Sequence, residues 1–358
     1  MTAQLEATSI DLAAVEEFAG KVATDQTAAY NAVLIYLGDR LGIWKALASV
    51  DAATSAELAQ HMGLGERHLR EWLSAQAANG YVSYDAATER FSLPAEHAMV
   101  LADDDSPAFG VAVFEIIAAV WASVDQLAHA YATGEGVGWH DHDLRLFTGV
   151  DRFYRTHYRS SLLSEWLPAV DGLVERLQAG IRVIDVGCGL GSATLLLAEA
   201  FPASTFVGVD FHEESVQRAS AAAEAAGVAD RVHFEVADAT SYSGTYDLVC
   251  FFDAVHDMGD PVGALAHARS VLSADGQVFA VEPYAEDRLE DNLNNPVAAV
   301  FYAASSCLCV PCSVSQGGAA LGAQAGPARL TGAFKDAGFG TARVAASTPY
   351  NLVIEARA

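Results

Sequence analysis

The first half of the chain is dominated by helical periodicity. Apolar residues recur at spacings of three and four positions from Leu12 to Val22, from Ala28 to Leu47 and from Ala108 to Ala132, which predicts amphipathic helices. A further helix, rich in tyrosine, arginine and histidine, is expected from Asp151 to Trp166. The N-terminal half is therefore predicted to be mostly helical.

One segment in this half combines two helices with a hairpin. Thr54 or Ser55 can cap a helix through Glu57, and glycines at 63 and 65 then break it. A second helix follows and ends at Gly80. It carries Leu69, Trp72, Leu73 and Gln76 on nearby faces, and the strands after it are expected at Tyr81–Tyr84 and Phe91–Leu93. Helix, turn, helix and small hairpin form the winged-helix pattern.

From Arg182 onward, short apolar strands alternate with alanine-rich helices. The expected strands are Val183–Val186, Thr205–Val209, Val232–Val236, Tyr246–Phe252, Gln277–Val281, Thr341–Ala345 and Leu352–Glu355. The expected helices are Gly191–Phe201, Glu214–Ala226, Pro261–Leu272 and Arg329–Ala337. This alternation predicts an α/β fold in which helices cover both faces of a parallel sheet.

Composition narrows the class of protein. The 358 residues suit about two domains, and 52% hydrophobic residues can bury a large core. The 46 acidic and 20 basic side chains give a net charge of -26, which disfavours nucleic acid and anionic membranes as partners. The start, MTAQLEATSIDL, lacks the basic region of a signal peptide. Five cysteines do not make a disulfide framework, so we expect a soluble cytoplasmic protein.

The segment VIDVGCGLG, from Val183 to Gly191, carries the sharpest chemical signal. An apolar strand ends at Asp185 and runs into glycines at 187, 189 and 191, with a helix directly after them. Ligands of open α/β sheets bind at such strand ends. A dinucleotide fingerprint has the spacing GxGxxG and faces a pyrophosphate, whereas Asp185 repels an anion. The pattern favours a cationic ligand over a nicotinamide dinucleotide.

Two more carboxylates follow the next two strands. Asp210, in FVGVDF, can accept both hydroxyls of a ribose, and Phe211 can flank the nucleoside. Asp238, in VADAT, can accept a hydrogen bond from an adenine amine. A cationic nucleoside without phosphates describes S-adenosylmethionine. The candidate contacts for this cofactor are Asp185, Gly187, Cys188, Gly189, Gly191, Asp210, Phe211, Asp238, Ala239, Phe252 and Asp253.

These segments resemble the motifs of class I S-adenosylmethionine-dependent methyltransferases from about Leu162 to the C-terminus. VIDVGCGLG, FVGVDF, VADAT and YDLVCFFDAVHDM are similar to the family's first four motifs. HDMGDP and SQGGAALGAQAG resemble a bacterial two-domain group with an N-terminal winged helix. The resemblance implies a Rossmann-like seven-stranded sheet whose last strand is reversed. It also implies a winged-helix and dimerisation domain (1–105), a helical linker and pocket segment (106–165) and a catalytic domain (166–358).

The pair His256-Asp257 resembles the catalytic site of small-molecule O-methyltransferases. In those enzymes a His followed by Asp after the fourth strand is the base, and a Glu ending the fifth strand flanks it. His256 and Glu282 match these positions, while Met258 replaces the family's Trp. The resemblance implies O-methylation of a small molecule with His256 as general base. The ordinary histidine pKa, about 6.5, suits a base at neutral pH.

Several alternatives stay open at this level. His256 can instead be a structural residue, as in an N- or C-methyltransferase without a His base. The winged helix can belong to a ligand-sensing transcriptional regulator, although its second helix offers only Arg67, His68 and Arg70 beside two acids. We expect it to form a homodimer through apolar faces that include Tyr30–Leu47.

Three other clusters deserve an interpretation. CLCVPC, with cysteines at 307, 309 and 312, and GWHDHD, with histidines at 140 and 142, have partial metal-ligand spacing. No complete ligand set accompanies either one, so we expect no metal, with the thiols buried over the pocket. Phe153, Tyr154 and Tyr158 are candidates for the pocket wall.

Overall fold

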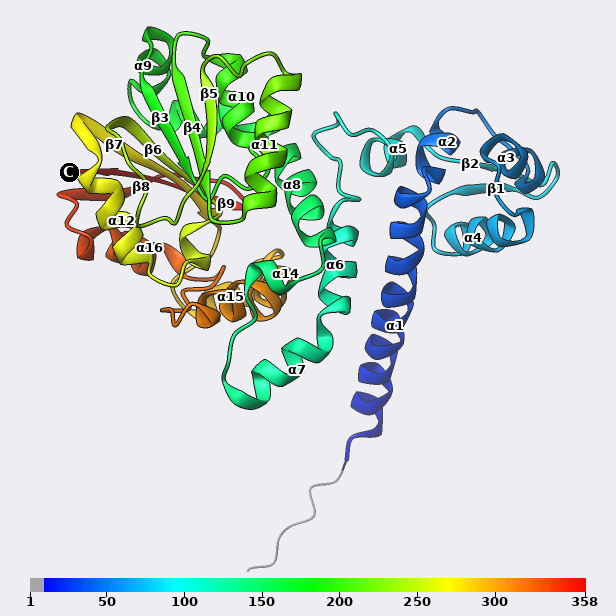
Figure 1. Cartoon of the computed structure of the whole chain (residues 1–358). Coiled ribbons are helices and arrows are strands. Elements are labelled where there is room, and N and C mark those ends of the chain that lie inside the picture. Colours follow the sequence, from blue (N-terminus) through cyan, green and yellow to red (C-terminus); the bar gives the residue numbers. More distant parts are fainter. Residues whose placement is uncertain (1–9) are drawn as a thin grey trace, which may run out of the picture. The chain divides into compact units, whose positions relative to one another are not determined.

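The computed structural model describes residues 10–358 and divides the chain into two compact units, residues 1–114 and 115–358 (Figure 1). Residues 1–9, which carry most of the segment tested for a signal peptide, lie outside the described part. The boundaries predicted at residues 105 and 165 stay predictions.

The N-terminal unit consists of a long helix that is followed in the sequence by a winged-helix domain. Its elements are α1 (Leu12–Arg40), α2 (Ile43–Ala48), α3 (Ser55–Met62), α4 (Glu66–Ala78), β1 (Ser83–Asp85), β2 (Arg90–Ser92) and α5 (Ala95–Leu101). Thr54 caps α3 in a capping box with Glu57, as the sequence predicts. Leu69, Trp72, Leu73 and Gln76 are the buried residues of α4. The helices expected at 12–22 and within 28–47 are one helix that breaks only at Gly42, where φ is 72°.

The second unit begins with helices that precede the sheet. They are α6 (Val113–Ala122), α7 (Val124–Thr133), η1 (Trp139–Asp141), α8 (Arg145–His157), the π-helical η2 (Tyr158–Trp166), η3 (Leu167–Ala169) and α9 (Leu173–Ala179). The single helix expected at 108–132 is wrong, because the chain bends by 62° between α6 and α7. The hydroxyl of Ser123 bonds to the carbonyl of Ala119 at this bend, and such back-bonding bends helices.

The sheet has seven strands in the order β5-β4-β3-β6-β7-β9-β8. The strands are β3 (Arg182–Val186), β4 (Thr205–Asp210), β5 (Val232–Val236), β6 (Tyr246–Phe252), β7 (Leu272–Pro283), β8 (Thr341–Ser347) and β9 (Asn351–Arg357). The helices between and after them are α10 (Ser192–Ala200), α11 (Glu213–Ala225), η4 (Val255–Asp257), α12 (Pro261–Ser270), α13 (Leu289–Asn292), α14 (Ala298–Ala304), the π-helical η5 (Ser305–Cys309), α15 (Val310–Ser315) and α16 (Gly326–Asp336).

The last strand, β9, runs antiparallel to both β7 and β8, and the other pairs are parallel. This confirms the Rossmann-like sheet with a reversed last strand. Each face of the sheet has its own buried apolar cluster, one against Trp166 and Leu197 and the other against Leu265 and Phe334. Because β3, β4 and β6 are neighbours, their carboxyl ends meet at one edge, which is where ligands of such sheets bind.

The continuous helical run Ala298–Ser315 is apolar and long enough to cross a membrane by length and composition. In this structure it packs against the unit's other helices. Leu308 and Cys309 join Leu146 and Phe147 in a buried cluster, and the Tyr131 hydroxyl donates to the carbonyl of Ser306. The run thus lies next to His256 and Asp257, at the edge of the sheet where the candidate cofactor contacts gather.

Candidate active site

The glycine loop after β3 is held against the end of β4. The amides of Gly187 and Cys188 both donate to the carbonyl of Val209, at 2.8 and 3.0 Å. The amide of Gly189 donates to Asp210 Oδ2 at 2.9 Å. Gly187 and Gly189 have φ of 76° and 53°, a left-handed conformation that favours glycine. Gly191 lines neither of the cavities described below, and a Cβ there would come within 2.6 Å of the Phe234 ring.

Asp185 is buried beneath this loop. Its Oδ2 accepts a hydrogen bond from the Thr194 hydroxyl at 2.6 Å, while Oδ1 is buried with no hydrogen-bond partner among the described residues. Burial raises the pKa of Asp185 to about 7, despite the opposing hydrogen bond from Thr194. A buried carboxyl oxygen without a partner is costly, so this side chain is prepared for a ligand that carries positive charge or a donor.

A large, partly open cavity of about 490 Å³ lies beyond the ends of β3, β4 and β5. Seven of the sequence-predicted contacts line it: Gly187, Gly189, Asp210, Phe211, Asp238, Ala239 and Asp253. Both oxygens of Asp210 already accept backbone amides, from Gly189 and His212. Asp238 Oδ1 accepts both the amide and the hydroxyl of Thr240. The two carboxylates are therefore fixed in orientation and keep lone pairs for a nucleoside.

A second, smaller cavity, of about 90 Å³, adjoins the first and shares Trp139, Gly187 and Gly189 with it. Asp185, Cys188 and Phe252 line this cavity, together with Tyr154 and Tyr158 from the α8–η2 helix. Of the three aromatic residues proposed as a wall, Phe153 does not line it; its ring packs on Tyr154. Asp253 lines the larger cavity. The structure thus brings all predicted cofactor contacts except Gly191 to two adjoining cavities.

His256 lies on η4 with both ring nitrogens facing carboxylates. Its Nδ1 is 2.6 Å from Glu282 Oε2, and its Nε2 is 3.1 Å from Asp257 Oδ1. Glu282, the penultimate residue of β7, is fully buried. Its two oxygens also accept the amides of Ala254, Val255 and His256. Glu282 therefore holds both the ring and the backbone of the loop that carries the histidine.

The charge state of His256 differs from the sequence expectation. Burial alone lowers the pKa of His256, but the carboxylates of Asp257 and Glu282 outweigh it and raise the pKa well above its ordinary value. The two carboxylates therefore favour the protonated ring and make the neutral imidazole a stronger base than an isolated one. The sequence shows Asp257 beside His256, but it does not show that the two carboxylates take opposite ring nitrogens.

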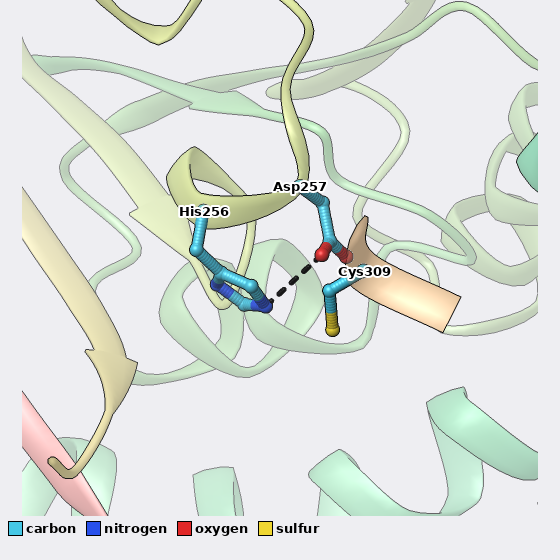
Figure 2. Close-up of side chains that lie close together, drawn as sticks. All are labelled: His256, Asp257 and Cys309. Atoms are coloured by element: carbon cyan, nitrogen blue, oxygen red, sulfur yellow. Dashed lines mark ion pairs between the residues drawn. The ribbon is translucent and has the colours of Figure 1, made fainter. Parts of the chain in front are cut away.

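Cys309, from η5, lies close to His256 and Asp257 (Figure 2). The ligand atoms of His256, Asp257 and Cys309 lie within 4.8 Å of one another. Since both nitrogens of the ring already face carboxylates, we assign this group to the surroundings of the base. Burial, together with the nearby Asp257, raises the pKa of the Cys309 thiol to about 11. Cys312 is also buried and lines the large cavity, while Cys307 is half-buried.

The histidines of GWHDHD do not come together around a site. His142 is buried and its Nδ1 lies 3.0 Å from the Ser123 hydroxyl. The His140 ring is exposed and lies 6.3 Å from the Phe211 ring, at the mouth of the large cavity.

The stretches HDMGDP and SQGGAALGAQAG, which lie about 55 residues apart in the sequence, contact each other beside His256. The Ser313 hydroxyl donates to the carbonyl of Met258 at 2.8 Å, and the amide of Gly259 donates to Gln316 Oε1 at 3.2 Å. A Cβ on Gly318 would collide with Gly259. The stretch SQGGAALGAQAG therefore clamps the stretch HDMGDP. Their contact, and the place of Gln316 in the cavity wall, have no signal in the sequence.

Comparison with known proteins agrees with this arrangement. Residues 177–326 match the family model "Methyltransferase domain", and residues 29–103 match "Rv2258c-like winged HTH domain". The 27-O-demethylrifamycin SV methyltransferase of Amycolatopsis mediterranei is 34% identical over 105 residues, which cover 28% of this chain and 38% of that enzyme. The chain spans a quarter to a half of the first curated relatives it matches, 26 to 47% of their lengths.

Solved structures share the fold over almost the whole chain. A putative O-methyltransferase from Nostoc punctiforme has a TM-score of 0.73 at 21% identity, covering 94% of this chain and 98% of that one. Human N-acetylserotonin methyltransferase, solved in complex with S-adenosylmethionine, has a TM-score of 0.67 at 16% identity, covering 98% and 99%.

The two cavities fit S-adenosylmethionine, the methyl donor expected for this methyltransferase domain. The left-handed glycines leave room for a ligand beside the loop. Asp210 and Asp238 offer oxygens to a nucleoside, and Asp185 and Asp253 offer buried carboxyl oxygens without hydrogen-bond partners among the described residues. An acidic socket suits a cation better than a phosphate. The chain thus combines a methyltransferase domain, matched over residues 177–326, with an N-terminal winged-helix domain, matched over residues 29–103.

Proposed function

We propose that the protein methylates a hydroxyl oxygen of a small molecule, with His256 as the general base. S-adenosylmethionine supplies an electrophilic methyl group when bound. The observation that carries the proposal is the pair of His256 and Glu282, 2.6 Å apart, behind a loop whose Asp257 and Met258 line the donor cavity. A hydroxyl needs to lose its proton as it attacks, and an imidazole held by a buried carboxylate is suited to take it.

The roles of the two carboxylates follow from the nitrogens they face. Glu282 holds Nδ1, so Nε2 is the atom available to an acceptor. Asp257 lies at Nε2 and also lines the cavity. An acceptor hydroxyl therefore takes the place of Asp257 at Nε2 when it donates its proton. Both carboxylates then stabilise the imidazolium that results.

The acceptor chamber is expected beside this loop, within the large cavity. Trp139, Met258, Cys312 and Gln316 line it there, which gives a mixed wall of aromatic, sulfur and amide groups. Such a wall suits a small, partly apolar molecule. The similar solved structures include mitomycin 7-O-methyltransferase, with a TM-score of 0.68, and their names support a small-molecule acceptor for this chain.

An acceptor screen with isotopically labelled S-adenosylmethionine tests the proposed function. We expect label to appear on the oxygen of at least one phenol or alcohol, with mass spectrometry and NMR locating the methyl group. The matched panel holds amines and activated carbon acids of similar size. Label only on nitrogen or carbon would contradict O-methylation and would leave His256 without the proposed role.

We also propose that the protein is a homodimer formed through α1. The helix is 29 residues long, and only Asn31, Ile35 and Gly38 are buried in it. A stripe of exposed apolar side chains follows one face: Val15, Phe18, Val22, Tyr30, Val33 and Leu37. At 1.5 Å per residue this stripe runs for about 35 Å, longer than the apolar patches of most monomers. A second copy of the same helix, meeting it across a two-fold axis, would bury both stripes.

The dimer is tested by charging this stripe. The double substitution Phe18→Asp and Val22→Asp is expected to convert a dimer into a monomer at micromolar concentration, as measured by light scattering after size exclusion. Glu16→Gln and Glu17→Gln, on the same helix but off the stripe, serve as the control and leave the mass unchanged. A wild-type protein that is monomeric in this measurement contradicts the proposal.

Nucleic acid is not part of the proposed function. On α4, the helix that would enter a DNA groove, Arg67 pairs with Glu71 and Arg70 pairs with Glu66. On the hairpin, Arg90 pairs with Glu57 at 2.7 Å. These cations are balanced within the domain, which leaves little positive charge for phosphates.

A further inference from the structure

We infer that Asp253 senses the positive charge of the donor, so that the pocket binds the sulfonium form more tightly than the neutral, demethylated product. This inference rests on the methyl donor and not on the acceptor or on His256 as the base. It assigns to one carboxylate the discrimination between a fresh donor and a spent one.

The position of Asp253 places it at the centre of the donor site. It follows β6 directly, between Phe252, which lines the smaller cavity, and Ala254, which lines the larger one. The two cavities share Gly187 and Gly189. The donor is an adenosine joined to an amino acid through its sulfur, so a molecule that fills both cavities has its sulfur where they meet. Asp253 stands at this junction.

The carboxyl group of Asp253 is buried, and the Tyr154 hydroxyl interacts with it only outside ordinary hydrogen-bond geometry. Both of its oxygens are buried, and none of the described residues gives them a hydrogen bond that meets ordinary geometry. The backbone is left-handed here, with φ of 51°, and the amide of Asp253 donates to the carbonyl of Val281 at 2.7 Å. An unpaired buried carboxyl costs free energy that a structural role does not return. Such a group is expected where a ligand completes it.

The surrounding charges show what kind of ligand is missing. Burial and the Glu282 carboxylate raise the pKa of Asp253 well above its usual range, Asp257 raises it further, and His256 and the Tyr154 hydroxyl oppose them. The carboxyl groups of Asp253, Asp257 and Glu282 thus lie around one imidazole, that of His256. A cation placed at the junction would compensate the excess negative charge and favour the ionised form of Asp253.

The chemistry of sulfur makes this arrangement selective. A sulfonium carries a full positive charge but has no N–H or O–H, so it gains from a bare carboxylate rather than from a hydrogen-bond acceptor of any particular geometry. The thioether of the product is neutral and gains nothing from the same group. A carboxylate satisfied by N–H donors would lose much of this preference, so the lack of partners for Asp253 serves the discrimination.

Calorimetric titration with S-adenosylmethionine and with S-adenosylhomocysteine tests the inference without any acceptor. In Asp253→Asn, we expect affinity for S-adenosylmethionine to fall at least about tenfold, with affinity for the product within about twofold of wild type. Asparagine keeps the size of the side chain and tolerates the left-handed backbone, so the variant is expected to fold. Asp238→Asn is the matched control, because loss of a nucleoside contact weakens both ligands equally.

A second comparison needs no substitution. Sinefungin carries a protonated amine in place of the sulfonium methyl, and wild-type protein is expected to bind it at least about tenfold more tightly than S-adenosylhomocysteine. Equal weakening of both ligands in Asp253→Asn would overturn the inference and assign Asp253 to the ammonium group that both ligands share. No change in either affinity, or no preference for the cation in wild type, would also overturn it. None of these results depends on the identity of the acceptor.

Discussion

Replacing His256 by alanine is expected to lower kcat by about 10²- to 10⁴-fold, the usual contribution of a positioned general base. The variant lacks the imidazole Nε2, so no group is in place to receive the proton of the acceptor hydroxyl. The donor contacts lie on other residues, around the glycine loop and the ends of β4 and β5. Affinity for S-adenosylmethionine is therefore expected to stay within a few-fold of wild type. Single-turnover rates with a saturating acceptor, together with calorimetry of donor binding, separate the two effects.

Controls distinguish chemistry from damage to the fold. His256→Ala leaves Glu282 buried beside a cavity, so thermal unfolding is compared with that of His256→Asn, which keeps a polar group near the Glu282 carboxylate. His267→Ala is the matched control, since the His267 ring lies 2.7 Å from the carbonyl of Tyr242 and lines neither cavity. Turnover of His256→Ala and His256→Asn within threefold of wild type would show that the base is elsewhere, or that none is needed.

The sequence predicts which carboxylates gather at the edge of the sheet, because they belong to local patterns. Asp185, Asp210 and Asp238 each follow an apolar strand, and a parallel sheet brings such strand ends to one edge. His256 and Glu282 follow β6 and end β7, which are neighbours in the sheet, so their meeting also follows from strand order. In each case the pattern that forms the strand also positions the side chain.

The rest of the site depends on contacts that periodicity does not encode. Trp139 lines the cavity from a short helix that precedes the sheet, and Cys309 reaches the base from a helix between β7 and β8. The SQGG stretch, at the end of α15, contacts Gly259. The solvation of a side chain is equally hidden. Nothing in FFDAVHDM indicates that both oxygens of Asp253 are buried without partners, because that depends on what the loop is packed against.

The clamp of Glu282 on three successive amides links the fold to the chemistry. Its oxygens satisfy the backbone of Ala254, Val255 and His256, so the loop after β6 needs this carboxylate to take its shape. The same carboxylate sets the ring orientation and the charge of the base. One buried residue therefore serves stability and basicity together, and a substitution there changes both unless it preserves the shape of the side chain.

The pH dependence of the reaction is expected to reveal the effect of the Glu282 carboxylate on the pKa of His256. The base works only when the His256 ring is neutral, so kcat/KM for the donor is expected to rise with pH. Asp257 and Glu282 raise the pKa of His256, and the midpoint of the rise is therefore expected above about 6.5, the value of an isolated histidine. Glu282→Gln removes one negative charge and lowers the pKa, so its midpoint is expected at least about one pH unit below that of wild type.

The two changes in Glu282→Gln act in opposite directions, and this makes the test specific. At acidic pH a larger fraction of the histidine is neutral in the variant, but a ring with a lower pKa is a weaker base, so the plateau at high pH is expected to fall while the curve shifts toward acid. A purely structural loss would lower the plateau without moving the midpoint. Glu286→Gln, an exposed residue of the same connection, is expected to move neither. A wild-type midpoint at or below the ordinary histidine value, or one that Glu282→Gln leaves in place, would mean that His256 is not the group whose ionisation limits the reaction.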